Sequence, residues 1–225
     1  MLNILIILII FCKVSLGEVV VDRGCVYGDD ISPYLPHVKI SCGFGFNEER
    51  VIPESLIIQK TSVKNLDLKP LTRVRRKGVL LEKEDIEKAL RQLLLKYKDI
   101  NFEIKKINYG NNIYVRSKGE FSITLPQKFY GSVNITLNNG QKNYLIYSYI
   151  EAFKDGYVAD KKIPAEKEIE HYVRKERVNI TNIKDELITD PSRFCAKKQI
   201  IPNKPITLGD VYQKYDVKKG ETLKI

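Results

Sequence analysis

The chain has 225 residues, which is enough for one large domain or two to three small ones with buried cores. Hydrophobic residues form 43% of it and charged residues 29%, a composition that indicates a globular protein and excludes a largely disordered one. The formal net charge is +10, and this excess bears on which partners the chain can bind.

The first 17 residues have the pattern of a secretory signal peptide. Residues 2–11 form an almost unbroken apolar run, shorter than the roughly 20 residues that span a bilayer. Ser15 and Gly17 place small side chains at the −3 and −1 positions of a cleavage site before Glu18. No Lys or Arg precedes the apolar run, so an uncleaved N-terminal anchor is the alternative. We predict export, with no transmembrane span left after cleavage.

Residues 18–72 are predicted to form a β-rich N-terminal segment. Strands are expected at 19–21, 38–42, 55–59 and 62–68, with a turn-rich connection over 27–36. Gly43 and Gly45 are expected in a bulge or a tight turn. A phosphate-binding loop would need a third glycine and a following Lys-Ser/Thr pair, and neither is present.

Three cysteines remain after cleavage of the leader. In an oxidising compartment Cys25 and Cys42 can form a disulfide, which would contribute on the order of 2–4 kcal/mol. Cys195 would then be a free, buried thiol. The sequence has no CxxC pair, and His37 and His171 are far apart, so we predict no metal site and no cofactor.

The densest basic cluster consists of Arg73, Arg75, Arg76 and Lys77. In an exported protein this cluster favours an acidic protein, an anionic lipid or a cell-wall polymer as partner over nucleic acid. Its plainest interpretation is a solvated linker that separates the N-terminal segment from a middle segment, residues 73–155.

The middle segment is predicted to be α/β, with one amphipathic helix over 82–98. Its apolar residues keep the spacing of a single helix face, and acidic residues begin the helix while lysines end it, as the helix dipole favours. Packing against a sheet is the expected role, and a membrane-surface or partner helix is the alternative. The apolar face consists of Ile86, Ala89, Leu90, Leu93, Leu94 and Tyr97.

Five strands are predicted after this helix, at 101–107, 113–116, 121–125, 133–137 and 144–153. Asn138-Asn139-Gly140 predicts a hairpin with a primed turn, because Asn-Gly tolerates positive φ. Tyr144, Tyr147 and Tyr149 are interpreted as one face of a sheet.

The last part of the chain repeats one phrase. Residues 158–169 return as residues 195–206, and each copy reads as a basic strand, a turn with proline and an Ile that leads onward. The phrase contains no nucleophile, metal-ligand spacing or phosphate cradle, so it is expected to present a surface. Between the copies we expect a strand at 174–180, and Asp190 capping a short helical turn that begins with Pro191.

Residues 157–169, 190–194, 197–206 and 217–225 resemble a SAF domain, and more narrowly the flagellar basal-body P-ring formation protein. Gly28-Asp29-Asp30-Ile31 is similar to the opening turn of that family. The resemblance implies a β-clip SAF module over 156–225 and a chaperone-like role in the bacterial periplasm. Its implied partners are the flagellar P-ring subunit and, as a second candidate, rod proteins.

The chain departs from the family pattern in two places. Ala165-Glu166 replaces the usual glycine of the first turn and Asn203-Lys204 occupies the second, so left-handed backbone is expected there, at some cost for Glu166. The family continues with further strands beyond Ile225, so the SAF module is expected to be incomplete, with an open edge.

The fold class is therefore predicted as mainly β (α+β). We predict non-catalytic protein binding through exposed hydrophobic and edge-strand surface, with Lys161, Lys162, Lys197 and Lys198 steering an acidic partner. The alternative is an exported SAF scaffold of a pilus or secretion machine of the tight-adherence type.

An enzyme is not expected. Asp29/Asp30 and Glu48/Glu49 are neighbouring carboxylates, but adjacent residues on a strand point to opposite faces and cannot share one substrate.

Overall fold

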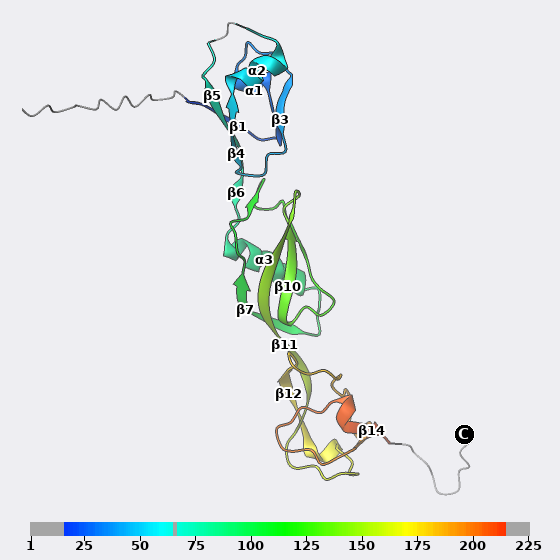
Figure 1. Ribbon diagram of the computed structural model, residues 1–225. Coiled ribbons are helices and arrows are strands. Elements are labelled where there is room, and N and C mark those ends of the chain that lie inside the picture. The colour runs from blue at the N-terminus through cyan, green and yellow to red at the C-terminus, as the bar shows by residue number, and fades with distance from the viewer. Residues whose placement is uncertain (1–15, 65–66, 215–225) are drawn as a thin grey trace, which may run out of the picture. The chain divides into compact units, whose positions relative to one another are not determined.

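The computed structural model describes residues 16–64 and 67–214. Strands dominate, with three short or medium α-helices, so the predicted mainly β (α+β) class is confirmed (Figure 1). The described residues form two compact units: 16–64 and 67–82 with 111–122 and 137–144, and 83–110 with 123–136 and 145–214. None of the helices in the described ranges is both long and apolar enough to cross a bilayer. Residues 1–15, which include the apolar run of the predicted signal peptide, and residues 217–225 lie outside the described ranges.

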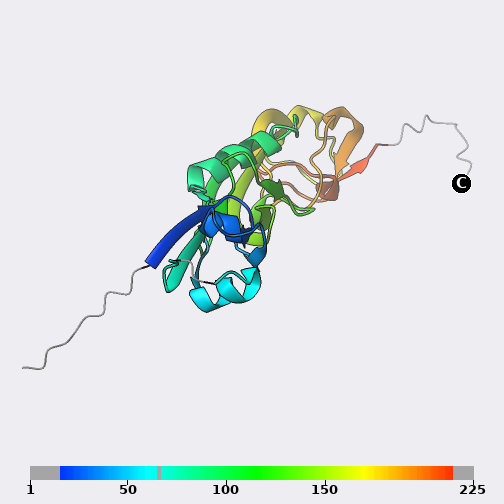
Figure 2. The ribbon, with the colours of Figure 1, turned by 90° about the horizontal axis from the view of Figure 1, so that it is seen from above.

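A three-stranded sheet organises the first unit. β5 (Leu71–Arg76) is its central strand, parallel to β1 (Leu16–Val21) and antiparallel to β4 (Glu49–Pro53). Figure 2 shows β1 and β5 running side by side. The inward side chains of this sheet pack against α2 (Glu54–Thr61) and the short pair β2 (Cys25–Tyr27) and β3 (Lys39–Cys42). The buried core consists of Val21, Val26, Leu35, Ile40, Phe44, Ile52, Ile57 and Val74.

The three arginines of the basic cluster, Arg73, Arg75 and Arg76, lie in strand β5, so the interpretation of this cluster as a solvated linker is wrong. Alternation along β5 turns Thr72, Val74 and Arg76 inward and leaves Arg73 exposed. The buried Arg76 guanidinium donates to the Phe44 carbonyl oxygen at 2.8 Å and stacks over the Phe46 ring at 4.1 Å. Burial lowers the pKa of Arg76, with a smaller contribution from the charge of Arg116.

The predictions of strands at 55–59 and 62–68 in this unit are also wrong. Residues 55–59 lie in helix α2, because Ile57 and Thr61, four residues apart, share one buried face. The Thr61 hydroxyl donates back to the Ile57 carbonyl oxygen at 2.8 Å. Ser62 then ends the helix in left-handed backbone, with φ of 59°. No strand forms in the described part of 62–68.

The first unit also contains α1 (Gly28–Ile31) and the antiparallel pair β6 (Val79–Leu80) and β8 (Tyr114–Val115). The predicted hairpin at residues 138–140 is present: Asn139 N donates to Lys142 O at 3.2 Å, which makes Gly140 and Gln141 the central residues of the turn. Gly140 has φ of 83°, the positive value that a type II′ primed turn needs at its first central position. The Asn139 side chain also holds the turn by accepting hydrogen bonds from the amides of Gln141 and Lys142, both at 3.0 Å.

A five-stranded sheet organises the second unit, in the order β12-β11-β10-β9 with β7 also paired to β11. β11 is long enough that β7 pairs with its middle and β12 with its end. The strands are β7 (Asn101–Asn108), β9 (Ser122–Thr124), β10 (Gly131–Asn138), β11 (Asn143–Ala159) and β12 (Val173–Asn179).

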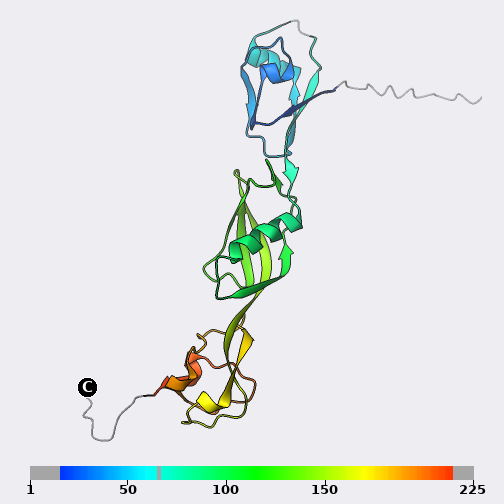
Figure 3. The ribbon, with the colours of Figure 1, turned by 180° about the vertical axis from the view of Figure 1, so that it is seen from behind.

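The predicted amphipathic helix is α3 (Lys83–Leu94), which lies across one face of this sheet (Figure 3). Ile86, Leu90 and Leu94 are buried, as the apolar spacing predicts. The helix ends before Tyr97, whose ring instead packs against Phe129 with 4.4 Å between ring centroids.

Gly28 provides a test of the packing around α1. A Cβ atom at this position would lie 2.4 Å from the backbone oxygen of Pro36, which cannot move without its chain. We expect Gly28→Ala to lower the free energy of unfolding by about 1–3 kcal/mol, the usual cost of overpacking. Urea unfolding followed by circular dichroism measures this. Gly119→Ala is the matched control, because a Cβ there meets nothing within 4 Å. Equal effects of both substitutions would contradict the packing argument.

Candidate functional site

The repeated phrase folds into two equivalent copies that cross each other. Every residue of 158–169 corresponds to the residue 37 positions later. At the centre, Ile163 N donates to Ile200 O and Ile200 N donates to Ile163 O, both at 2.9 Å. Such reciprocal bonds relate the copies by an approximate two-fold axis.

The remaining backbone bonds between the copies also occur in matched pairs. Ala159 N to Lys204 O, at 3.0 Å, corresponds to Ala196 N to Lys167 O, at 2.9 Å. Asn203 N to Ala159 O, at 2.7 Å, corresponds to Glu166 N to Ala196 O, at 2.9 Å. We call residues 156–214 the duplicated turn module.

Three matched pairs of side chains fill its core. These six residues are at most 1% exposed. Ile188 and Val211 are buried in the same core. Each copy therefore contributes the same three side chains to one shared core, which neither copy can form alone. The matched pairs are Ala159 with Ala196, Ile163 with Ile200, and Ile169 with Ile206.

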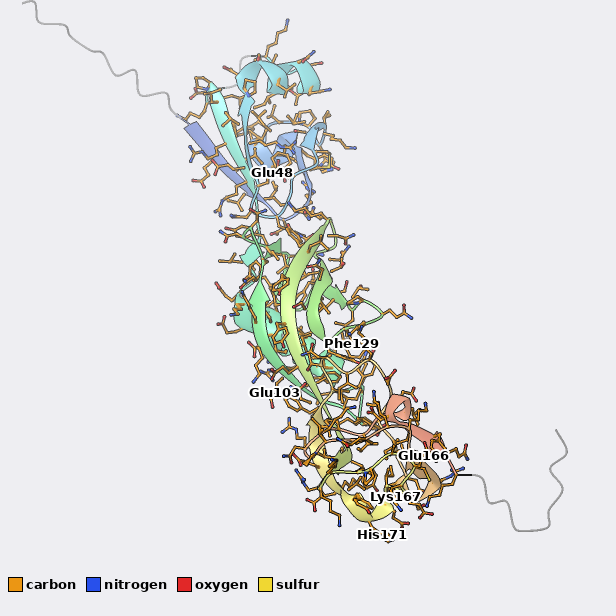
Figure 4. The ribbon with its side chains drawn as sticks, turned by 60° about the horizontal axis from the view of Figure 1, so that its bottom comes forward. Glu48, Glu103, Phe129, Glu166, Lys167 and His171 are labelled. Atoms are coloured by element: carbon orange, nitrogen blue, oxygen red, sulfur yellow. A yellow bond between two sulfur atoms is a disulfide. The ribbon has the colours of Figure 1, made fainter. Side chains whose placement is uncertain are left out.

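Both turns adopt the left-handed backbone that the sequence predicts. Glu166 has φ of 64° and Asn203, its equivalent, has φ of 63°. The side chain of each accepts a hydrogen bond from the strand that follows the other copy: Tyr212 Oη donates to Glu166 Oε2 at 2.6 Å, and Arg174 Nη2 donates to Asn203 Oδ1 at 2.9 Å. The Glu166 carboxylate is the main cause that raises the pKa of Tyr212. Figure 4 labels Glu166 at the first turn.

The predicted lysines divide into two exposed groups, one on each copy. Lys161 and Lys162 belong to the first copy, and Lys161 Nζ lies 4.8 Å from the Tyr172 ring centroid. Lys197 and Lys198 belong to the second copy, where Lys198 Nζ is 4.0 Å from Asp210 Oδ1. The correspondence between the copies pairs Lys161 with Lys198, whereas Gln199 matches Lys162 and Asp160 matches Lys197.

The second group differs from the first because a carboxylate is buried beside it. Burial alone would raise the pKa of Asp210, but hydrogen bonds from Lys204 Nζ, at 2.5 Å, and from the Thr207 hydroxyl, at 3.0 Å, hold it below its usual value. Asp210 therefore stays ionised and offsets part of the positive charge at this turn. Sequence reasoning missed Asp210, whose role depends on folding.

The structure joins Cys25 and Cys42 in a disulfide across the β2–β3 pair. The two residues are 17 positions apart, and closing a loop of this length contributes about 3 kcal/mol by restricting the unfolded chain. Cys195 is a free thiol, as predicted, but it is half-buried and not buried, because it lies on the short strand β13 (Phe194–Ala196), opposite Tyr212 on β14 (Val211–Gln213).

The neighbouring carboxylates have separate structural partners. Asp30 accepts from Tyr27 N at 2.8 Å, whereas Asp29 bonds His37 Nδ1 at 2.9 Å. Glu48, labelled in Figure 4, accepts from Gly45 N at 2.6 Å and so holds the glycine turn. Glu49 instead pairs with Arg73 on the neighbouring strand at 2.7 Å. Within the described ranges, no three His, Cys, Asp or Glu side chains gather as metal ligands do.

Comparisons with known proteins show that this chain is similar to three solved structures. No protein-family model and no curated protein sequence matches the chain. The flagellar protein FlgA from Thermotoga maritima MSB8 matches with 16% identity and a TM-score of 0.37, over 92% of this chain and 83% of that chain. Salmonella FlgA matches in its open form with 12% identity and a TM-score of 0.44, over 62% of this chain and 68% of that chain. Its closed form matches with 14% identity and a TM-score of 0.39, over 61% and 71%.

The bond between Tyr212 and Glu166 has a pH dependence that can be measured. The pKa of Tyr212 is raised in the folded protein, so its contribution to stability is complete below the unfolded value of about 10 and is lost as pH rises above it. We expect Tyr212→Phe to be less stable than the wild type at pH 7, with the difference shrinking above pH ~10. Chemical unfolding at several pH values measures this.

Glu166→Gly supplies the control for that experiment. Glycine adopts φ of 64° without strain and has no carboxylate, so Tyr212→Phe should have a smaller effect in its background, where only the interaction of Tyr212 with Cys195 remains. A Tyr212→Phe effect of equal size in both backgrounds would contradict the proposed bond.

Proposed function

We propose that this chain is an exported, non-catalytic assembly factor that binds the flagellar P-ring subunit in the periplasm. The observation that carries this proposal is the duplicated phrase, which forms one frame with an exposed lysine group on each copy. The phrase also carries the resemblance to SAF domains and to the P-ring formation protein.

An oxidising compartment fits the first unit. The Cys25–Cys42 disulfide joins two strands of a small unit, and such bonds persist in secreted and periplasmic proteins but are rare in the cytosol. The apolar leader ahead of Glu18 provides a route to that compartment. Together these features support periplasmic localisation.

Binding explains the polar groups of the module better than catalysis does. The buried Asp210 is held by Lys204 and Thr207, and Glu166 is held by Tyr212, so these carboxylates stabilise the turns. Lys162 and Lys197 are exposed and flank the turns. Exposed charges of this kind act at a distance and speed the approach of a partner of opposite charge.

The lysine groups can be tested by charge reversal. We expect Lys161→Glu with Lys162→Glu to slow association with the purified P-ring subunit about tenfold at low salt, and to weaken the salt dependence of the rate. Lys197→Glu with Lys198→Glu should act in the same direction but less, because Asp210 already offsets charge there. Stopped-flow association at several salt concentrations gives both quantities.

Lys60→Glu with Lys64→Glu is the matched control, because it changes the net charge equally from exposed positions in the first unit. Equal slowing by this control would show that only net charge matters. Unchanged rates in all variants would remove the lysines from the mechanism. Absence of any binding to the P-ring subunit, with capture of a pilus-assembly component instead, would favour the SAF scaffold alternative.

A further inference from the structure

A groove in the second unit has the composition of a peptide-binding site. It has a volume of about 490 Å³ and lies between the end of α3 and the start of β7. Its apolar lining comes from the helix end, the following turn and the strand, and its polar lining includes three basic side chains but no acidic one. The apolar residues are Leu94, Leu95, Tyr97, Ile100, Phe102 and Ile104, and the basic residues are Arg91, Lys98 and Arg177.

Leu95 is the most informative residue of this groove. It directly follows α3 and its side chain is 77% exposed, although it stands beside the buried Leu94. A second hollow, of about 360 Å³, also contains Arg91 and Leu95, so the two hollows meet at this leucine. An exposed leucine between two hollows gives a ligand an apolar anchor that is already in place.

The wall behind the groove is built from packed rings. Phe129, labelled in Figure 4, has its ring centroid 4.4 Å from that of Tyr97 and 5.6 Å from that of Phe102. Phe129 also contacts Tyr130 at 5.9 Å. Aromatic side chains that pack on one another lose little freedom when a ligand binds, so this wall is largely preformed.

Two of the basic side chains are held in position. Arg91 donates to Glu87 Oε1 from both Nε and Nη2, at 3.1 and 2.6 Å. Arg177 donates to Glu103 Oε1 at 3.0 Å and lies over the Phe153 ring at 4.2 Å. Each guanidinium has five N–H donors, so both retain donors for a further carboxylate.

The strand beside the groove is at the edge of its sheet. In the described ranges β7 pairs with β11 alone, and Figures 1 and 3 both show it at the margin of the sheet. An edge strand presents a row of backbone N–H and C=O groups to an added strand. In such an added strand alternate side chains point the same way, so one set can enter the groove while the other remains in solvent.

We propose that this groove, with the free edge of β7, binds an extended segment of a partner protein in which apolar residues alternate with Asp or Glu. Charge complementarity favours this occupant, because Lys98 and the remaining N–H donors of Arg91 and Arg177 line the groove and no acidic residue does. The chain's own ends suit it less: residues 2–11 contain no acidic residue, and residues 215–225 carry more lysines than carboxylate side chains. This inference concerns the chemistry of the segment and stands whether or not the partner is the P-ring subunit.

The test uses a fluorescein-labelled ten-residue peptide that alternates Val with Glu, and the full chain. We expect binding by fluorescence anisotropy with Kd below about 1 mM, and at least about tenfold weaker binding for Leu95→Asp and for Lys98→Glu. Both residues are exposed, so the variants should keep the wild-type circular dichroism spectrum and thermal midpoint.

Matched controls are Leu145→Asp, an equally drastic change at another exposed leucine of the same unit, and Lys60→Glu. Both should bind the peptide within about twofold of the wild type. Two further peptides carry N-methyl groups on either the odd or the even backbone amides. Addition to the β7 edge predicts that only one of them loses binding, because successive amides of a strand point to opposite sides.

Several outcomes would overturn the proposal. These are no binding below about 1 mM, equal binding of a peptide that alternates Val with Lys, or an equal loss in the Leu145→Asp variant. Equal binding of both N-methylated peptides would show that the β7 edge takes no part in binding the peptide. If deletion of residues 215–225 tightened binding about tenfold, the occupant would be the chain's own end and the partner proposal would be wrong.

Discussion

Two backbone hydrogen bonds between Ile163 and Ile200 set the geometry of the duplicated turn module. Each contributes only about 0.5–1.5 kcal/mol by itself. Their larger effect is to fix where two copies of one phrase cross, which brings four isoleucines and two alanines into one core. Burying an isoleucine side chain contributes about 1.5–3 kcal/mol. The free energy gained by burying the four isoleucines therefore exceeds that of the two hydrogen bonds that position them. The same crossing delivers Glu166 and Asn203 to the strands that hold their side chains.

Because the core of the module depends on two matching copies, some of its features could be predicted from the sequence. The two copies align without a gap, and matched apolar positions were visible as a pattern because each fills the same place in a shared core. The left-handed turns could also be located, since a turn that usually contains glycine was occupied by Glu166 and Asn203. Predictions from the local sequence pattern were wrong where contacts with residues distant in sequence determine the structure. Residues 55–59 have strand-forming side chains, yet the burial of Ile57 together with Thr61 requires a helix. Arg76 belongs to a run of basic residues, yet a carbonyl oxygen and a ring distant in sequence provide it with a buried site.

The two copies share a backbone but differ in the charges around it. Position 161 in the first copy and position 198 in the second are both lysine, but the first lies over Tyr172 and the second near the buried carboxylate of Asp210. An aromatic face leaves the lysine charge available to a partner, whereas a carboxylate neutralises part of it. Duplication thus supplies a shared frame, and divergence at several neighbouring positions makes its two arms unequal. A partner of uneven charge can then bind in one orientation in preference to the other.

The lysine groups and the groove beside β7 are both basic, but physics assigns them different parts of a binding reaction. Exposed lysines act through a field that is screened within about 8 Å at physiological salt, so they mainly alter the rate at which an acidic partner arrives. The groove removes apolar surface from water around Leu95 and offers Arg91 and Arg177 to carboxylates at close range, so it mainly alters the rate of departure. Salt should therefore weaken the first contribution much more than the second. For the assembly factor proposed above, this separation would let the rates of capture and release be changed independently.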